Sequence, residues 1–347
     1  MKAIVLHEFG GPEKLSYEDV ETPKVGPDEV LVKVGAVSVN RTLDMVVQAG
    51  KYARKPRLPH IPGVDPSGEI IEVGDNVTDR RVGDRVFCSI FIPTDDPEAH
   101  VVIPGLGPVD FLGVTTWGGY AEYVKTPARC TMPIPDNLSF HDATVIGRHL
   151  GTASSQVEAV LGVKEGDWLL VMGASGGLGA VCIQVAKWNG ANVIAAAGTD
   201  EGVAAAMGVG ADFGINYRSQ DLTEEVRRIT DGKGVNGVCE NVADPELFPM
   251  VIYSMAQGAK LVTAGNASGN LEVPLDIRYL YLNQLHIIGE PREQPGGLAK
   301  AFERAATGDV KTIIDKVFPL SQAADAQRRV LAREGIGKVV IDPTLDA

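Results

Sequence analysis

Cysteine is scarce in this chain of 347 residues, in which only Cys88, Cys130, Cys182 and Cys239 are present. They are far apart, and no two have the C-x-x-C spacing of a structural zinc site. Three of them lie within apolar patterns typical of strands or helices. The sequence therefore supports neither a cysteine-bound metal nor a disulfide framework.

Long hydrophobic runs and an excess of positive charge are also missing. No apolar run approaches the roughly 18 residues of a membrane-spanning helix, and polar residues interrupt residues 1–8 before a signal-peptide core can form. We therefore expect a cytoplasmic protein with no membrane partner. Lys and Arg number 32 against 45 Asp and Glu, a net charge of -13. Such a surface repels phosphate backbones, so we expect no nucleic-acid partner.

Glycine, in contrast, is abundant, and three glycines organise the chain. Residues 168–187 consist of an apolar run, a turn containing Gly173, Gly176 and Gly179, and a helical pattern. A turn without Cβ atoms lets a pyrophosphate approach the N–H groups at a helix N-terminus, where the helix dipole favours negative charge. We interpret this stretch as a dinucleotide-binding turn in which Gly179 lets the helix lie close to the strand.

Further apolar runs follow at the spacing of a βα repeat, and they are residues 193–197, 213–217, 237–242, 260–264 and 285–289. Helical patterns fill the gaps, for example residues 201–207 and 222–230. Six strands alternating with helices predict a doubly wound parallel sheet, whose ligand lies at the carboxyl ends of the strands.

The segment before the glycine turn has a different character. Short alternating runs broken by Gly and Pro predict a small, irregular β barrel, and they are residues 3–6, 29–34, 68–73, 85–89 and 120–124. A barrel fused to a cofactor sheet is expected to leave a cleft for a small-molecule substrate. From residue 294 onward, helical patterns and the strand at 339–341 are expected to return the chain to the barrel.

Specific motifs occur along nearly the whole chain, and they are PDEVLVKV (27–34), VNRTLD (39–44), GKY (50–52), PHIPGVD (59–65), GEIIEVG (68–74), VGDRV (82–86), GGYAEYV (118–124) and GKVVI (337–341). Together with the glycine turn they resemble the medium-chain dehydrogenase/reductase superfamily. The resemblance implies an α/β fold class with two domains. A GroES-like β-barrel domain would comprise residues 1–138 and 291–347, and a Rossmann domain with a doubly wound parallel sheet would comprise residues 139–290.

The resemblance also bears on metal binding. Alcohol dehydrogenases of that superfamily carry a catalytic Cys in the segment that matches residues 38–44, and Gly-His-Glu where this chain has Gly63, Val64 and Asp65. Both ligands are missing here, and residues 92–116, which match the structural zinc lobe, contain no Cys. The chain is therefore similar to the zinc-independent quinone oxidoreductase and enoyl reductase branch, and we expect no metal.

In that branch an Asn and a Tyr face the nicotinamide, and the matching residues are Asn40 and Tyr52. The resemblance implies that Tyr52 supplies a proton after hydride addition, while Asn40 holds the substrate carbonyl or the nicotinamide ribose. The alternatives are a packed loop aromatic for Tyr52 and a turn residue for Asn40. Asp65, a third catalytic candidate, either orients a neighbour in the site or satisfies backbone N–H groups in its own turn.

The resemblance implies a set of nucleotide contacts, and they are Thr152, Gly173, Ser175, Gly176, Gly177, Leu178, Thr199, Asp200, Tyr217, Asn241, Gly265, Gly289 and Lys338. Thr152 belongs to a Thr-Ala pair near the nicotinamide. Arg148 and His149 precede this pair where relatives are apolar, and they either meet an anionic substrate or cap a helix start.

Cofactor choice depends on the tip of the second strand. Gly198 and Thr199 leave room for a phosphate there, and Tyr217 and Arg218 match a position that often flanks it. The acids at positions 200–201 add negative charge, and the Lys usual a few residues later is missing. NADP(H) is therefore favoured, and NAD(H) remains possible.

We expect an NAD(P)H-dependent oxidoreductase that transfers hydride to an activated C=C bond of an enone or enoyl compound, or to a quinone, without zinc. Two alternatives stay open, a metal-free alcohol or aldehyde dehydrogenase of the same superfamily and a non-catalytic NADPH-binding protein. Relatives pair through the edge strand that matches residues 285–289, so the resemblance also implies a homodimer.

Overall fold

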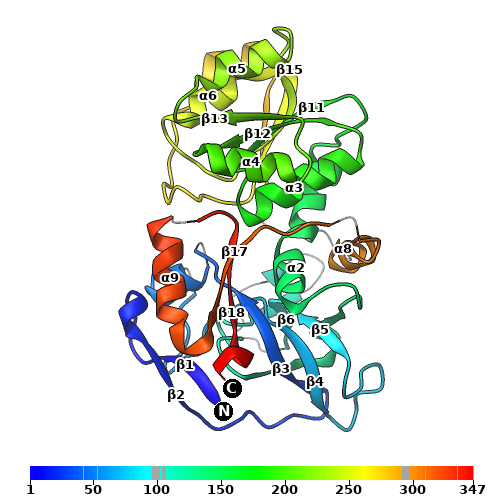
Figure 1. The fold of residues 1–347 in the computed structure, drawn as a ribbon, viewed down its shortest axis with the longest axis vertical. Helices are drawn as coiled ribbons and strands as arrows, with labels where there is room; N and C mark the ends of the chain where they lie inside the picture. Colours follow the sequence, from blue (N-terminus) through cyan, green and yellow to red (C-terminus); the bar gives the residue numbers. More distant parts are fainter. Residues whose placement is uncertain are drawn as a thin grey trace. The chain divides into compact units, whose positions relative to one another are not determined.

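The computed structural model describes residues 1–41, 43–52, 54–95, 102–103, 107–290, 297–308, 310–333 and 335–346. The chain divides into two compact units (Figure 1). The first comprises Met1–Arg148, Phe302–Gly308 and the C-terminal segment from Ile314, and the second comprises His149–Ala301 with a short segment that ends at Ile313. Within the described ranges, no helix combines the length and the apolar character needed to cross a membrane.

The first unit is built on a seven-stranded sheet in the order β10-β5-β4-β3-β18-β17, with β9 also paired to β3. Its strands are β3 (Glu29–Ser38), β4 (Ser67–Val73), β5 (Arg85–Cys88), β9 (Tyr123–Pro127), β10 (Thr131–Pro133), β17 (Ile314–Pro319) and β18 (Lys338–Asp342). Val30, Val32 and Val34 alternate along β3 and are buried in one apolar cluster with side chains of β4, β5 and β9. The C-terminal strand β18 runs antiparallel to β3, with Val340 opposite Ser38, so the tail rejoins the barrel as expected.

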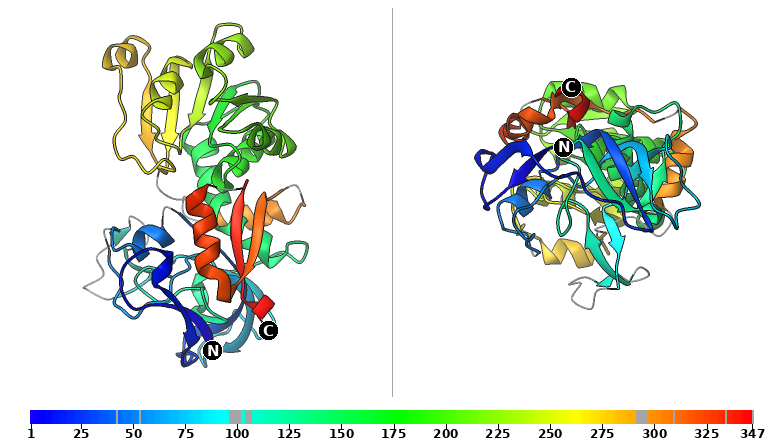
Figure 2. Two further views of the ribbon diagram at one scale, coloured as in Figure 1. Left: turned by 60° about the vertical axis from the view of Figure 1, so that its left-hand side comes forward. Right: turned by 90° about the horizontal axis from the view of Figure 1, so that it is seen from below.

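Smaller elements complete the first unit. The strands β1 (Lys2–Leu6) and β2 (Leu15–Asp19) form a hairpin, and β6 (Phe91–Pro93), β7 (Val102–Ile103) and β8 (Gly107–Phe111) form a three-stranded sheet. The helices are α1 (Asp44–Gln48) and α9 (Ala323–Ala332). The helix α2 (Phe140–Ser154) begins in the first unit and ends in the second, while α8 (Gly297–Ala305) begins in the second and ends in the first. Figure 2 shows α9 beside β17 and β18, and Ala323, Ala326 and Val339 share one apolar cluster there.

Neither α1 nor α2 was predicted as a helix from the sequence. The helix α1 is only five residues long. The helix α2 contains Gly147, Gly151 and a β-branched run at residues 144–146, all of which have low helix propensity. Burial decides the outcome in α2, because Val145 and Ile146 are fully buried.

The second unit contains a six-stranded sheet in the order β13-β12-β11-β14-β15-β16, in which all neighbours are parallel. Its strands are β11 (Trp168–Met172), β12 (Asn192–Ala197), β13 (Phe213–Asn216), β14 (Val235–Cys239), β15 (Met255–Thr263) and β16 (His286–Gly289). The helices are α3 (Gly177–Trp188), α4 (Asp200–Gly208), α5 (Leu222–Ile229), α6 (Leu247–Tyr253) and α7 (Ile277–Leu282), and α3 and α4 lie on the opposite side of the sheet from α5 and α6 (Figure 1). The predicted doubly wound parallel sheet is thereby confirmed.

The strand order of the second unit reverses between β11 and β14. Leu169, Leu170 and Val171 of β11 are fully buried, as expected for a parallel sheet covered on both faces. The carboxyl ends of strands flanking such a reversal form the crevice in which doubly wound folds bind dinucleotides. A cofactor is therefore expected to bind at the turn after β11.

Candidate cofactor and active sites

The turn after β11 has the geometry of a nucleotide-binding turn. Gly173 has φ +63, in the left-handed region that glycine tolerates. A Cβ on Gly179 would clash with Gly173 O and lie 2.9 Å from Ala174 Cα, so only glycine lets α3 begin this close to β11. Gly176, the N-cap of α3, makes no side-chain cap hydrogen bond. The first N–H groups of α3 therefore have no side-chain cap, the arrangement that suits a pyrophosphate. The other predicted contacts here, Ser175, Gly177 and Leu178, lie in the turn and the first turn of α3.

The tip of β12 is predicted to decide between NADP(H) and NAD(H). It lies beneath two side chains that follow β13. A Cβ on Gly198 would lie 3.0 Å from Tyr217 Oη and 3.3 Å from Arg218 Nε. Both side chains therefore lie over Gly198. They present a hydroxyl and a guanidinium group at the tip of the strand.

The next two residues along the chain are engaged in local hydrogen bonds. Thr199 is the N-cap of α4, and its Oγ1 accepts a hydrogen bond from Gly202 N at 3.0 Å. Asp200 is exposed, and its Oδ1 accepts from Asn216 Nδ2 at 2.7 Å. Thr199 thus stabilises the start of α4, and the Asp200 carboxylate is held by β13.

Three predicted cofactor residues meet at the carboxyl ends of β14, β15 and β16. Asn241 follows β14, Gly265 follows β15 and Gly289 ends β16, and these strands are neighbours in the sheet. Asn241 Oδ1 accepts from Ala264 N at 2.8 Å, which joins the ends of β14 and β15. Thr152 lies near the C-terminal end of α2 and is partly buried.

Arg148 and His149 lie in the interior of α2. The interpretation that they cap a helix start is therefore wrong. Arg148 Nε is buried and has no hydrogen-bond partner among the described residues. The helix starts instead after Ser139, whose Oγ accepts from Asp142 N at 3.0 Å, and this Ser-x-x-Asp signal in the sequence was missed.

Asp65 is the centre of a buried polar network in the first unit. Its Oδ1 accepts from Ser38 N at 2.9 Å, and its Oδ2 accepts from Ser38 Oγ at 2.6 Å and from Asn40 Nδ2 at 2.9 Å. Thr144 Oγ1, on α2, donates to Asp65 main-chain O. The structure therefore brings two of the three catalytic candidates, Asn40 and Asp65, into direct contact. The partners of the Asp65 carboxylate lie at the end of β3, just after it and on α2, not in its own turn.

Lys338 and Asp44 extend this network. Lys338 Nζ donates to Asn40 Oδ1 and to Val39 O, both at 2.8 Å. Asp44 Oδ2 accepts from Asn40 N at 2.9 Å and from Tyr120 Oη at 3.0 Å. Lys338, predicted as a cofactor contact, is thus anchored on Asn40.

Burial sets the electrostatics of the network. It raises the pKa of Asp44 to about 7, and the neighbouring charge of Asp65 adds to this rise. It also lowers the pKa of Lys338 to about 8, although the two carboxylates oppose that change. Neither Asp44 nor Tyr120 was predicted as a site residue from the sequence. The available signal was the position of Asp44, four residues after Asn40 at the start of a short helix.

Tyr52, the third catalytic candidate, lies outside these hydrogen bonds. It packs on an apolar cluster that contains Leu43, Val47 and Val64. No hydrogen bond to another described residue involves its Oη. The phenol is therefore fixed by packing, and its hydroxyl is not engaged within the described ranges.

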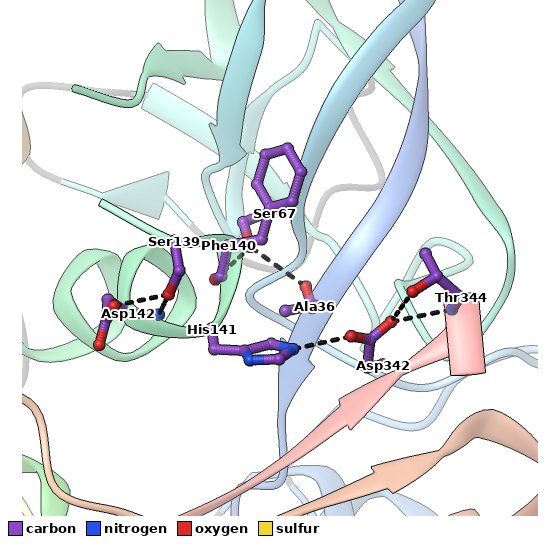
Figure 3. A network of polar contacts seen from close by, with 8 residues as sticks. All are labelled: Ala36, Ser67, Ser139, Phe140, His141, Asp142, Asp342 and Thr344. Atoms are coloured by element: carbon purple, nitrogen blue, oxygen red, sulfur yellow. Dashed lines mark hydrogen bonds and ion pairs between the residues drawn. The ribbon is translucent and has the colours of Figure 1, made fainter. Parts of the chain in front are cut away.

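A depression of the first unit, with a volume of about 450 Å³, is lined by side chains of β3, β4, β5, α2 and β18, including Lys33, Glu69, Arg85, Phe140, His141 and Asp342. Figure 3 shows its polar groups bonded to one another. His141 Nε2 and Asp342 Oδ2 are 2.8 Å apart, and Thr344 Oγ1 donates to Asp342 Oδ1 at 2.6 Å. Ser67 Oγ donates to Phe140 O at 2.7 Å. These contacts fasten the start of α2 to the sheet and to the C-terminal segment.

Comparison with known proteins agrees with this geometry. Residues 26–136 match the family model of the alcohol dehydrogenase GroES-like domain, and residues 177–307 match that of zinc-binding dehydrogenase. The quinone oxidoreductase of Rattus norvegicus is 30% identical over 352 aligned residues, covering 98% of this chain and 97% of the relative. The alcohol dehydrogenase of Geobacillus stearothermophilus is 34% identical, covering 98% and 99%.

A crystal structure of an NAD-dependent alcohol dehydrogenase shares the fold, with a TM-score of 0.91 at 35% identity over 99% of both chains. Family models, relatives and structure thus agree over almost the full length. The chain belongs to the medium-chain dehydrogenase/reductase superfamily, in its quinone oxidoreductase-like branch, and is an NAD(P)-dependent oxidoreductase.

Proposed function

We propose that this oxidoreductase reduces an activated C=C bond of an enone or enoyl compound, or a quinone, with NAD(P)H and without zinc. The hydrogen bonding of Asp65 carries the proposal. All four hydrogen bonds to its carboxylate, from Ser38 N, Ser38 Oγ, Asn40 Nδ2 and Thr144 Oγ1, come from N–H or O–H donors. Val64, where alcohol dehydrogenases have His, is buried among apolar side chains. A carboxylate saturated in this way beside an apolar residue does not fit a zinc site, and the described residues contain no group of three or more His, Cys, Asp or Glu that suits a metal ion.

The second unit fits a dinucleotide, and we favour NADP(H). Tyr217 Oη and the Arg218 guanidinium group offer a hydroxyl and a positive charge to a ribose 2′-phosphate. The Asp200 carboxylate, which would hold a free ribose, is engaged by Asn216. NAD(H) remains possible because Asp200 is exposed at the same tip. When bound, the nicotinamide supplies the hydride for the reaction.

The remaining roles fall to side chains of the first unit. Tyr52 Oη is the proposed donor of the proton that completes the reduction. Both donors and the acceptor of the Asn40 amide are engaged by Asp65, Ser38 and Lys338. Asn40 is therefore better suited to orienting the Lys338 ammonium group than to binding the substrate carbonyl directly.

The first test is a fluorescence titration of the purified protein with NADPH and NADH, followed by turnover assays with quinones, enones and enoyl thioesters. We expect tighter binding of NADPH and oxidation of it by at least one of these compound classes, unaffected by a zinc chelator. Tyr52→Phe should lower kcat with little change in the NADPH Kd, whereas Asn40→Ala should raise that Kd. Failure to oxidise either nucleotide with every compound would contradict the proposal.

A metal-free alcohol or aldehyde dehydrogenase is the second candidate, because a relative at 34% identity is an alcohol dehydrogenase. Steady reduction of NAD(P)+ by simple alcohols, with no turnover of quinones or enones, would favour it. Tight NADPH binding with no turnover of any kind, unchanged in Tyr52→Phe, would instead identify a non-catalytic NADPH-binding protein.

We also propose that the second unit forms a homodimer through β16. Ile287 on this edge strand is 40% exposed, and Tyr281 and Leu282 on α7 are 64% and 62% exposed. An apolar strand edge needs a cover, and a second copy supplies one. Replacement of Ile287 by Lys should shift the mass measured by light scattering from dimer to monomer. A monomeric wild-type protein would refute this assembly.

A further inference from the structure

Gln156 forms a reciprocal amide pair with Asn241 in the second unit. Gln156 Nε2 donates to Asn241 Oδ1 at 3.1 Å, and Asn241 Nδ2 donates to Gln156 Oε1 at 3.3 Å. Cys182 Sγ, on α3, donates to the same Gln156 Oε1 at 3.4 Å. Gln156 and Cys182 are fully buried, so neither has water as an alternative partner.

The backbone around Gln156 is unusual. Residues Ser155–Val160 form a π-helical turn directly after α2, and Leu161 N donates to Gln156 O at 3.0 Å. Such turns are rare in proteins, and those that occur are often found at functional sites. This one directs a buried polar side chain toward the carboxyl ends of β14 and β15.

The orientation of the Asn241 amide is fixed by Ala264 N. That main-chain N–H donates to Asn241 Oδ1 at 2.8 Å, so the oxygen must face the end of β15 and the NH2 group must face Gln156. Asn241 O also accepts from Ala267 N at 3.0 Å. Asn241 therefore joins the tips of β14 and β15, and the hydrogen bonds from Gln156 brace this junction by holding the Asn241 amide in place.

Gly265 follows Ala264 directly and lies at the same junction, where a Cβ on Gly265 would be 3.5 Å from Asn241 O. The tip of β12, which would hold the ribose of the adenosine half, and the tips of β14 and β15 lie on opposite sides of the pyrophosphate turn after β11 in the strand order. The strand tips that Gln156 braces are therefore expected to face the nicotinamide half of the cofactor. The pyrophosphate turn and the tip of β12 belong to other segments of the sheet edge. A defect in the brace should consequently affect one half of the nucleotide.

We propose that Gln156 is a positioning residue that fixes the Asn241–Gly265 rim for the nicotinamide half of the cofactor, with Cys182 holding the Gln156 carboxamide in place. The inference rests on the proposed binding of NAD(P)H by the second unit. Gln156 acts through Asn241 and needs no contact with the nucleotide of its own.

The test compares two ligands and two buried glutamines. Gln156→Leu removes the hydrogen bonds with little change in volume. The matched control is Gln184→Leu, because Gln184 on α3 is also buried and also makes a reciprocal pair, with the main chain of Lys311. The ligands are NADPH and adenosine 2′,5′-bisphosphate, which carries only the adenosine half. Calorimetric titration gives their Kd values, and thermal unfolding gives the Tm of each variant.

We expect Gln156→Leu to raise the Kd for NADPH about tenfold, since the loss of hydrogen bonds worth about 1.4 kcal/mol corresponds to that factor. The Kd for adenosine 2′,5′-bisphosphate should not change. Gln184→Leu should lower the Tm without changing either Kd. Gln156→Glu, which keeps the acceptor for Asn241 and Cys182 but loses the donor, should have an intermediate Kd for NADPH. It also serves if Gln156→Leu does not fold.

An unchanged Kd for NADPH in both Gln156 variants would overturn the proposal. Equal weakening of both ligands would overturn it as well, because it would mean a general loss of structure. Wild-type protein that binds neither NADPH nor NADH would refute the proposed function itself. The wild-type titration and the variant comparison therefore test the two ideas separately.

Discussion

Asp44 should make the first unit less stable as the pH rises from acid to neutral. Its carboxyl group is fully buried, and Oδ1 has no hydrogen-bond partner within the described ranges. Its pKa is about 7, against an ordinary value of 3.8. A carboxyl whose pKa is raised in the folded state contributes stability below its unfolded pKa, and this contribution is lost as the pH rises through the folded pKa.

The size of this effect follows from the pKa difference. The folded and unfolded pKa values of Asp44 differ by about 3, which corresponds to about 4 kcal/mol in the free energy of unfolding. About 2 kcal/mol of this is lost between pH 5 and pH 7. Lys338, with a pKa of about 8, stays mostly charged over this interval. Because Asp65 faces the same site, the contribution of Asp44 to the pH dependence of unfolding must be isolated by substituting Asp44 itself.

Urea unfolding of the wild type and Asp44→Asn at pH 5 and pH 7 makes this comparison. The Asn keeps an acceptor for Asn40 N and Tyr120 Oη but does not titrate. The variant should gain about 2 kcal/mol on the wild type between the two pH values. Glu21→Gln, at a side chain that is 83% exposed, is the control and should gain nothing. If Asp44→Asn changes the free energy of unfolding equally at both pH values, Asp44 does not titrate in this range and the reasoning fails.

Two further predictions concern the glycine turn and the C-terminal segment. Gly179→Ala should cost about 1–3 kcal/mol of stability and weaken NADPH binding, whereas Gly208→Ala on α4, where a Cβ meets nothing within 4 Å, should stabilise by up to about 1 kcal/mol. Thermal unfolding and NADPH titration check both, and equal effects of the two variants would contradict the close approach of α3 to β11. Burial opposes ionisation of Asp342, but the hydrogen bonds from His141 and Thr344 outweigh it and lower its pKa. The stability that the ionised Asp342 carboxylate contributes is present above about pH 4 and is lost as the pH falls through the folded pKa. In urea unfolding, Asp342→Asn should therefore destabilise the protein at pH 7 and do so less toward pH 3. A pH-independent effect would exclude this linkage.

Much of the second unit was predictable from the sequence because its signals are local. The six strands appear as apolar runs, and the dinucleotide turn is marked by Gly173, Gly176 and Gly179 within seven residues. Gly173 is needed for its left-handed backbone, and Gly179 because a Cβ there would clash with Gly173 and Ala174, its near neighbours in the chain. The order of the strands was not predicted, because right-handed connections restrict it but are compatible with more than one doubly wound order.

Motifs and resemblance singled out Asn40 and Asp65 but not what surrounds them. The network joins Asn40 and Asp44 to Asp65, Tyr120 and Lys338, which are far apart in the chain. Lys338 reaches it only because β18 pairs with β3. Their pKa values depend on burial, which no local pattern specifies. The brace on Asn241 was missed for the same reason.

The sequence by itself therefore determined the parallel sheet, its glycine turn and the family, because these depend on periodicity, on residues adjacent in the chain and on motifs. Tertiary structure alone decided that Asp44 and Lys338 are buried together, and that Gln156 reaches Asn241. Each of these depends on which distant side chains exclude water from the same place, and this is settled only when the chain has packed.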